Sequence, residues 1–431
     1  MSFKGKVRAK EFPQELEWLN TAQPLVLSEL YGKIVLLDFW TCCCINCMHV
    51  LPDLKKLEEK YPDELVVIGV HAAKFTNEKE TANIRQAILR YDITHPVVND
   101  LDGLVRRQYG VRAWPSFVLI DPEGKIVGRQ SGERIYELFD RYIEGLVREF
   151  AWRGQLDRVP LELQREQGAA ARFNKPQGIA LDGETLYVAD TQNHAVRKID
   201  LKARQVTTLI GTGRQAQRRS TGGTGRQVAL NSPWDLLVHN GSLYVALAGL
   251  HQLWRLDLQS DQIGPHAGSQ RENRLDGPLL QAALAQPSGI ATDGEKLYFA
   301  DSEVSSIRSA DLDPAGRVTT LVGEGLFEFG DEDGKGWGVK LQHPLGVLYC
   351  DGLVYVADTY NHKIKKLDLQ SRRCDTLVGT GQPGSADGLA TQAQLNEPSG
   401  LALAQNKLYI ADTNNHRVRV FDFASGLVST L

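Results

Sequence analysis

The sequence has no long apolar run and no excess of positive charge, and each absence excludes a class of protein. No window of its 431 residues approaches the roughly 18 to 20 apolar residues that cross a bilayer as a helix. The formal net charge is -4 and there is no basic stripe, which argues against nucleic acid as the main partner. The first residues, Met1 to Lys6, lack the apolar stretch of a secretory signal, so we expect a cytoplasmic protein with no membrane attachment.

Cysteine is also scarce, and its distribution is uneven. The chain has six cysteines, and four of them lie between Cys42 and Cys47. A disulfide framework is not expected in the cytosol, so this crowding indicates redox or metal chemistry. We find no cofactor-binding fingerprint and expect no cofactor. The hydrophobic content of 42% and charged content of 24% are those of a globular protein, and the length predicts two or three domains.

The crowded cysteines lie where a predicted buried strand gives way to a predicted helix. Residues 33–37 are mostly β-branched and aliphatic, and apolar residues recur three or four positions apart from Val50 to Leu57. Cys44 therefore lies at or just before a helix N-terminus, where free N–H groups and the macrodipole stabilise a thiolate. We expect the pKa of Cys44 to fall below its free value of about 8.5 and Cys44 to be the nucleophile. Cys47, three residues on, could attack a mixed disulfide formed at Cys44 and release the partner.

Asp38-Phe39-Trp40 followed by the Cys44-x-x-Cys47 pair resembles the active-site strand and helix of the thioredoxin fold. The segment Trp-Pro-Ser-Phe-Val-Leu-Ile-Asp at residues 114–121 resembles the stretch in which that family places a cis-proline facing the two cysteines. The resemblance implies that Pro115, directly after Trp114, shapes the substrate groove. It also implies that Asp38 is the buried carboxylate that accepts the proton of the resolving cysteine. Burial would raise the pKa of this carboxyl group toward neutrality, which suits a general base.

Two positions depart from the thioredoxin pattern. Ile45-Asn46 replaces the Gly-Pro of thioredoxin itself, and Cys43 stands where the family usually has tryptophan. The redox potential and the substrate are therefore left open by the resemblance. The βαβ alternation that surrounds the motif has predicted strands at 65–70, near 96–98, after Pro115 and at 125–129 and predicted helices at 77–91, 104–109 and 133–149. This order predicts a thioredoxin-like α/β domain over residues 1–150.

The second half of the sequence is repetitive. Prolines at 176, 233, 287, 344 and 398 each open a similar unit, at spacings of 57, 54, 57 and 54 residues. Each unit contains four short strand patterns with Gly and Asp at the turns, which predicts a propeller blade. The pairs Asn193-His194, Asn361-His362 and Asn415-His416 make the units resemble NHL repeats. We therefore predict an all-β NHL-repeat propeller over residues 174–431, after a linker over 151–173.

The number of blades is a separate question. The resemblance to NHL repeat-containing proteins with an N-terminal Cys-Ile-Asn-Cys domain implies six blades, but five are recognisable here. Residues 168–174 resemble the end of an inter-blade linker, yet no blade precedes them. We expect a closed or nearly closed ring of five blades with residues 160–173 at the seam between the first and the fifth. The alternative is a six-blade geometry in which one blade is missing.

Metal and histidine chemistry offer further interpretations of the same residues. A zinc site made from Cys42, Cys44, Cys47 and His49 would need four ligands within eight residues to surround the ion tetrahedrally, so we expect no metal. The histidines of the Asn-His turns recur around the ring instead of converging on one point, and turn hydrogen bonds explain them. His71, after the second predicted strand, is expected to be structural.

Two functions from different classes follow from these patterns. The first is a thiol-disulfide oxidoreductase acting in cell redox homeostasis, in which Cys44 attacks, Cys47 resolves, Asp38 moves protons, Trp114 and Pro115 border the groove, and the propeller presents a protein substrate. The second is a scaffold whose propeller binds a protein partner while the cysteines only sense the redox state. Both involve a protein partner or protein disulfide, and neither involves nucleic acid or a membrane.

Overall fold

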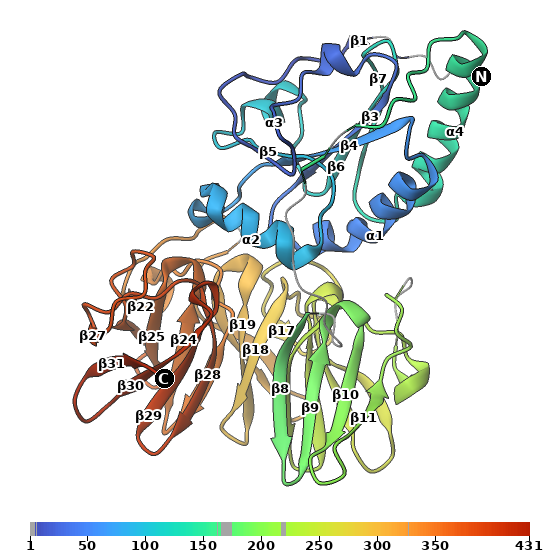
Figure 1. Ribbon diagram of the computed structural model, residues 1–431. Helices are drawn as coiled ribbons and strands as arrows, with labels where there is room; N and C mark the ends of the chain where they lie inside the picture. Colours follow the sequence, from blue (N-terminus) through green and yellow to red (C-terminus); the bar gives the residue numbers. More distant parts are fainter. Residues whose placement is uncertain (1–4, 6, 162, 165–174, 217–220, 326) are drawn as a thin grey trace. The chain divides into compact units, whose positions relative to one another are not determined.

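The chain divides into two compact units, Met1–Ala170 and Ala171–Leu431 (Figure 1). The structure is a computed structural model that describes residues 5, 7–161, 163–164, 175–216, 221–325 and 327–431. No helix among these residues is long and apolar enough to cross a bilayer. The predicted architecture, an α/β thioredoxin-like domain followed by an all-β propeller of five blades, is confirmed.

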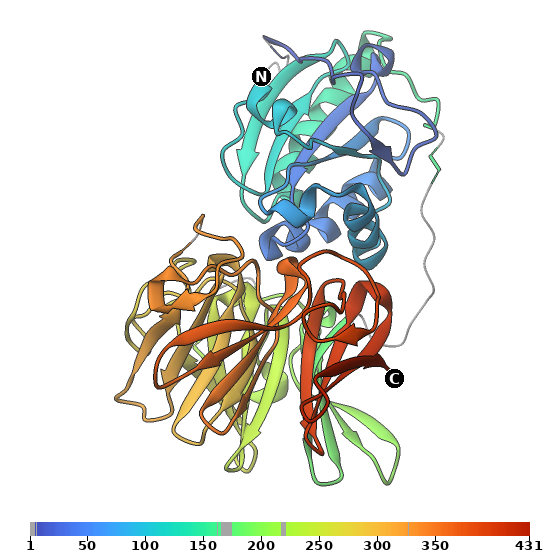
Figure 2. The same cartoon turned by 90° about the vertical axis from the view of Figure 1, so that its left-hand side faces the viewer.

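A seven-stranded mixed sheet forms the centre of the first unit (Figure 2). Its strands lie in the order β1-β7-β6-β3-β4-β5-β2, in which β3, β4 and β5 are parallel, β6 runs antiparallel to β3, and β7 runs antiparallel to β6. The strands are β1 (Val7–Arg8), β2 (Trp18–Leu19), β3 (Ile34–Trp40), β4 (Leu65–His71), β5 (Val97–Asn99), β6 (Ser116–Ile120) and β7 (Lys125–Ser131).

Helices cover both faces of this sheet because β3 is apolar on both sides. Ile34 and Leu36 pack with apolar residues of α1 and α4, and Val35 and Leu37 pack with residues of η1 and α3 on the other face. The pattern predicted as one helix over 77–91 forms two elements, η2 and α2. The helices are η1 (Leu27–Leu30), α1 (Ile45–Lys60), η2 (Thr76–Lys79), α2 (Thr81–Tyr91), α3 (Leu104–Gln108) and α4 (Tyr136–Trp152).

Five β-sheets form the second unit, one for each sequence repeat. In repeats two to five, a two-residue strand from the preceding segment pairs with the outermost strand. The strands of repeats one to three are β8 (Pro176–Asp182), β9 (Thr185–Asp190), β10 (Ala195–Asp200), β11 (Gln205–Ile210); β12 (Gly223–Thr224), β13 (Pro233–His239), β14 (Ser242–Leu247), β15 (Gln252–Asp257), β16 (Gln262–Ala267); β17 (Gly277–Pro278), β18 (Pro287–Thr292), β19 (Lys296–Asp301), β20 (Ser306–Asp311) and β21 (Arg317–Val322). Those of repeats four and five are β22 (Gly334–Lys335), β23 (Val347–Cys350), β24 (Leu353–Asp358), β25 (Lys363–Asp368), β26 (Arg373–Val378); β27 (Gly388–Leu389), β28 (Pro398–Ala404), β29 (Lys407–Asp412), β30 (Arg417–Asp422) and β31 (Leu427–Thr430).

Short 3-10 turns link the repeats to one another. One turn follows the second long strand of each repeat, and the residue after it has a left-handed backbone, as in His194 and His362 with φ of 46° and 54°. The Nδ1 atom of His194 accepts the Ser232 N–H at 3.1 Å, and that of His362 accepts the Glu397 N–H at 3.1 Å. These histidines therefore fasten one repeat to the next, as turn hydrogen bonding predicts. The turns are η3 (Thr191–Asn193), η5 (Ala248–Leu250), η6 (Ser302–Val304), η8 (Thr359–Asn361) and η9 (Thr413–Asn415), and η4 (Gly225–Gln227) and η7 (Gly336–Gly338) lie between repeats.

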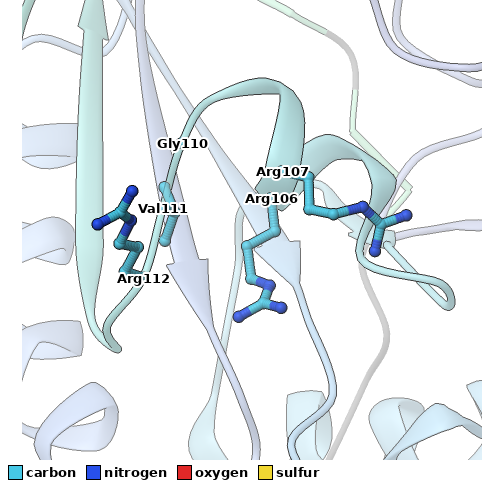
Figure 3. Close-up of a pocket in the computed structure, with 5 residues that line it drawn as sticks. All are labelled: Arg106, Arg107, Gly110, Val111 and Arg112. Atoms are coloured by element: carbon cyan, nitrogen blue, oxygen red, sulfur yellow. The ribbon is translucent and has the colours of Figure 1, made fainter.

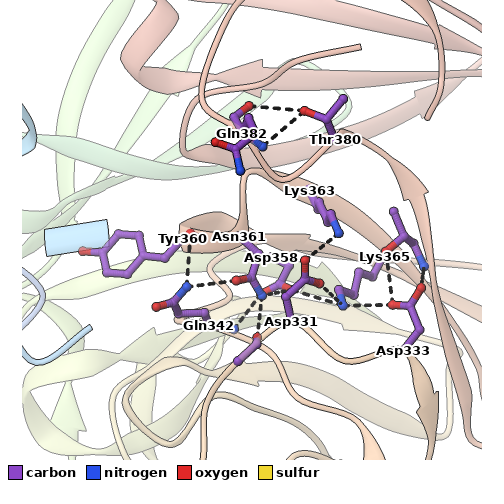
Figure 4. Close-up of polar contacts among 12 residues, drawn as sticks. Asp331, Asp333, Gln342, Asp358, Tyr360, Asn361, Lys363, Lys365, Thr380 and Gln382 are labelled. Carbon is purple, nitrogen blue, oxygen red and sulfur yellow. Dashed lines mark hydrogen bonds and ion pairs between the residues drawn. The ribbon is translucent and has the colours of Figure 1, made fainter. Parts of the chain in front are cut away.

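Buried ion pairs hold the interior of most blades. In the fourth repeat, the Lys365 ammonium donates to Asp331 at 2.8 Å and Asp333 at 2.9 Å and lies 3.7 Å from Asp358 (Figure 4). The equivalent pairs are Asp190–Arg197, Asp301–Arg308 and Asp412–Arg419. Repeat two has the apolar residues Leu247 and Trp254 at these two positions, and both are fully buried.

The ring of blades is not closed. Ile179 and Val206 of the first repeat are 64% and 50% exposed, whereas their equivalents Ile290 and Val318 in the third repeat are 5% and 0% exposed. On the other side, Val418 of the fifth repeat is 42% exposed. Its equivalents are buried against the following blade: Val196, Leu253, Ile307 and Ile364.

The expectation of a closed five-blade ring is therefore wrong. The first long strands of consecutive repeats contact each other, but β28 and β8 form no contact of that extent among the described residues. Counting repeats did not reveal this, because closure depends on the angle between blades. The five blades leave one position open, as in the six-blade alternative. Most of residues 160–173 lie outside the described residues, so their placement at the seam stays a prediction.

Candidate active site

Cys44 is the N-cap residue of α1. Its backbone is extended (φ -80°, ψ 109°), and its sulfur accepts the Cys47 N–H at 3.3 Å. No acidic residue lies in the first turn of the helix. The positive end of the helix and a backbone donor thus act on the Cys44 sulfur, and the first turn of the helix contains no opposing carboxylate.

Cys47 lies one turn into α1 and is fully buried. Burial raises the pKa of its thiol well above the usual value, and the Cys44 side chain and the Asp38 carboxyl group raise it further. Cys47 is therefore a thiol at neutral pH and needs a base before it can attack. None of the six cysteines, all of which lie among the described residues, is joined in a disulfide.

Asp38 supplies a carboxyl group suited to that task. It lies on the same face of β3 as Ile34 and Leu36, toward α1, and it is fully buried. Neither carboxyl oxygen has a hydrogen-bond partner in the described part of the chain. Burial raises the pKa of Asp38 to about 7, the charge of His95 opposes this shift, and that of Glu58 adds to it. A carboxyl group with this pKa can accept a proton near neutral pH.

His95 and Glu58 belong to this site, and sequence reasoning did not identify them. Glu58 lies near the C-terminal end of α1, and His95 lies in the loop before β5. The His95 Nδ1 atom is 3.5 Å from the Glu58 Oε2 atom. Neither residue is close to the cysteines in sequence, so no motif could have predicted their effect on Asp38.

Trp114 and Pro115 directly precede β6, the strand that pairs with β3. The bond between them is cis, as the resemblance to thioredoxin implied. Ser116 pairs with Phe39 in an antiparallel register, so Pro115 lies beside Trp40. Trp40 is the last residue of β3 before the cysteines. The Arg106 guanidinium lies over the Trp114 ring at 5.0 Å. Pro115 therefore lies at the end of β3 that leads into the turn with Cys44.

A pocket with a basic lining lies next to this segment (Figure 3). Its lining residues are Arg106, Arg107, Gly110, Val111 and Arg112, which come from α3 and from the loop that leads to Trp114. The three arginine side chains give the pocket positive charge, and no carboxylate is among the lining residues. An acidic group is the ligand that this lining favours.

Glu78 connects the cysteine turn to the loop before α2. One oxygen, Oε2, accepts the N–H groups of Lys74 and Phe75, each at 2.9 Å. The other, Oε1, accepts the Cys43 N–H at 2.8 Å and lies 3.2 Å from the Cys42 sulfur. Burial would raise the pKa of Glu78, but His71 and these hydrogen bonds outweigh it, and the pKa lies below its usual value. Glu78 is 35 residues from Cys43, and no sequence signal indicated this contact.

Comparisons with known proteins agree with both units. A thioredoxin-like family model matches residues 32–126, and the NHL repeat model matches residues 173–199, 341–367 and 395–421. The human protein named NHL repeat-containing protein 2 is 39% identical over 98% of this chain and 71% of its own length. The chain belongs to the family of NHL repeat-containing protein 2. A plant member, SUPPRESSOR OF QUENCHING 1 of Arabidopsis thaliana, is 41% identical over 96% of this chain.

The relatives in this family are longer than the chain. The chain spans 47% of the Arabidopsis protein, about half its length. The alignments with the plant and human proteins run over 492 and 515 positions, so each relative carries additional residues inside the region matched by these 431 residues. Among solved structures, an oxidised thioredoxin-like protein matches 35% of the chain with 23% identity and a TM-score of 0.31.

Proposed function

We propose that this protein is a thiol-disulfide oxidoreductase in which Cys44 is the nucleophile, Cys47 the resolving thiol and Asp38 the general base. Two features found together carry the proposal. Cys44 is an N-cap residue whose sulfur accepts the Cys47 N–H, and Asp38 is a buried carboxyl group whose pKa is about 7. A pair of structural cysteines would need neither feature.

The proposed reaction has two exchange steps. The Cys44 thiolate attacks one sulfur of the substrate disulfide, which forms a mixed disulfide and releases a substrate thiolate. Cys47 then gives its proton to Asp38 and attacks the Cys44 sulfur. The Cys44–Cys47 disulfide forms, and the second substrate sulfur leaves as a thiolate. The protein dithiol loses two electrons, the substrate disulfide gains them, and a separate reductant must restore the dithiol.

The surroundings of the groove support a protein substrate of defined charge. Trp114 and Pro115 directly precede β6, and the arginine-lined pocket lies next to them; we propose that these two residues border the substrate groove. We propose that the substrate segment carries acidic residues near its disulfide, that the propeller is a platform for protein interaction, and that the protein acts in the cytoplasm.

Trapping the mixed disulfide tests this function. In Cys47→Ser the first step proceeds and the second cannot, so the natural partner should stay linked to Cys44 and be identifiable by mass spectrometry under non-reducing conditions. The matched control is Cys44→Ser/Cys47→Ser, which should capture nothing at this position. Failure of Cys47→Ser to form an adduct with any disulfide, including a small model disulfide, would favour the scaffold function.

A further inference from the structure

Three side chains with different donor atoms meet beside the cysteine turn, apart from the Cys44–Cys47 pair. They are Cys42 from the turn, His71 from the end of β4 and Glu78 from η2, and one ligand atom of each lies within 4.8 Å of the other two. The Cys42 sulfur is 3.2 Å from the Glu78 Oε1 atom, and the Cys42 N–H points to the His71 Nε2 atom at 3.3 Å. The three residues come from three separate segments, so tertiary packing alone brings the donors together.

The donors are already oriented toward one another. The His71 ring is fully buried and packs edge-on against Trp40, with the ring centroids 4.9 Å apart. The Nε2 lone pair of this ring faces the cluster and accepts the Cys42 N–H, so an ion that binds Nε2 has to displace that hydrogen bond. The Oε2 atom of Glu78 is held by the Lys74 and Phe75 N–H groups, and Oε1 accepts the Cys43 N–H and faces the Cys42 sulfur. Ring packing holds His71 and two backbone N–H groups hold Glu78, so both side chains keep a fixed orientation.

The donor set matches the chemistry of zinc. Zinc binds thiolate sulfur at about 2.3 Å, imidazole nitrogen at about 2.0 Å and carboxylate oxygen at about 2.1 Å in a tetrahedron. In that geometry the sulfur and oxygen lie about 3.6 Å apart, close to the 3.2 Å between Cys42 and Glu78. A thiolate and a carboxylate together balance the charge of a divalent ion, so the loaded site is neutral and suits a buried position.

We propose that Cys42, His71 and Glu78 form a binding site for a divalent zinc-like cation. The ion replaces the proton of the Cys42 thiol, which is released to solvent, displaces the Cys42 N–H from His71 Nε2, and forms bonds to the Cys42 sulfur, His71 Nε2 and Glu78 Oε1. A fourth position is left for water. This site differs from the zinc site considered from the sequence, because His49 of that set pairs with Glu133 at 2.7 Å and Cys47 lies inside α1. The proposal does not depend on the oxidoreductase function.

The test uses the full chain with the Cys44–Cys47 pair removed, because a reduced dithiol can also bind zinc. Reduced, metal-stripped Cys44→Ser/Cys47→Ser protein is titrated with Zn²⁺ by calorimetry and with Co²⁺ by absorption spectroscopy. We expect binding that includes one thiolate ligand, seen as a sulfur-to-cobalt charge-transfer band, with release of protons. Adding Cys42→Ser should remove the band and weaken Zn²⁺ binding on the order of 100-fold or more.

Two further variants keep the test decisive. Glu78→Gln and His71→Ala should each weaken Zn²⁺ binding at least about 10-fold while the cobalt-thiolate band persists at higher Co²⁺ concentration. The matched control, Cys350→Ser in the propeller, should change neither readout. Absence of the cobalt-thiolate band in the double-serine protein, or a band that survives Cys42→Ser, would overturn the proposal. Circular dichroism of each variant checks that the fold is kept.

Discussion

Two buried aspartates, one in each unit, differ in what surrounds them. Asp301 of the propeller is fully buried, and its carboxylate accepts hydrogen bonds from the Arg308 guanidinium at 2.6 Å and from the Ala285 N–H at 2.7 Å. Asp38 is equally buried, yet neither of its oxygens has a hydrogen-bond partner among the described residues. Burial raises the pKa of both carboxyl groups. Only Asp301 has a cation within hydrogen-bond distance.

The difference indicates a structural role for Asp301 and a chemical role for Asp38. Repeat two shows that the propeller does not require the ion pair, because Leu247 and Trp254 fill the same two positions and the blade is retained. The unpaired carboxyl group of Asp38 opposes stability, since a buried group without partners costs free energy. Such a group is expected where a proton has to move.

The largest expected effect comes from breaking the paired aspartate. Arg308→Leu leaves Asp301 and Asp276 without their cation and should lower the free energy of unfolding of the propeller by about 3–5 kcal/mol. Urea unfolding followed by circular dichroism measures it. The matched control is the double variant Asp301→Leu/Arg308→Trp, which copies repeat two and should recover most of the loss. A single variant as stable as the parent chain would show that the pair contributes little.

The unpaired aspartate should respond in the opposite way. Asp38→Asn removes the base, and reduction of a small disulfide should slow on the order of 100-fold. Stability should stay the same or rise, because the amide carries no charge. Stopped-flow measurement of Cys44–Cys47 disulfide formation gives the rate, and Asp301→Asn serves as the control that should change stability without changing this rate. Equal rates for Asp38→Asn and the parent chain would remove Asp38 from the mechanism.

The free energy of unfolding should depend on pH because of Asp38. The pKa of Asp38 is about 7 in the folded chain and 3.8 in an exposed carboxyl group, so the folded state holds a proton that the unfolded state has lost between these values. The contribution of Asp38 to stability therefore falls as pH rises from about 4 to about 7, by up to about 1.4 kcal/mol per pH unit. Comparing urea midpoints of the parent chain and Asp38→Asn at several pH values isolates this term. Parallel pH profiles for the two proteins would contradict the raised pKa.

The smallest expected effect concerns substrate charge. Arg107 lines the pocket beside the groove, and Arg107→Glu should raise the KM for a disulfide peptide with acidic flanking residues several-fold through weaker attraction, an effect that salt reduces. A peptide with neutral flanks is the control and should be affected little. If both peptides respond alike, the pocket has no part in substrate selection.

The sequence predicted those parts of the site that are local in the chain or carried by a motif. Cys44, Cys47 and Pro115 fall within two short segments, and Asp38 lies in β3, the strand that directly precedes the cysteine segment. His95 and Glu78 could not be predicted, because they act on Asp38 and on the cysteine turn only after the loops before β5 and α2 pack against the sheet. Repeat periodicity likewise predicted five blades, but the open position between the first and fifth depends on the angle between successive sheets.

The most direct test of the oxidoreductase account is a redox titration of the full chain with disulfide mapping. The protein is equilibrated with mixtures of reduced and oxidised glutathione, quenched with acid, alkylated and digested, and the linked peptides are identified by mass spectrometry. We expect a reversible two-electron transition that links Cys44 to Cys47, with a midpoint between about -270 and -120 mV as in other thioredoxin-fold dithiols. Absence of the Cys44–Cys47 link across the whole series, or a predominant link from Cys44 to Cys42, would contradict it.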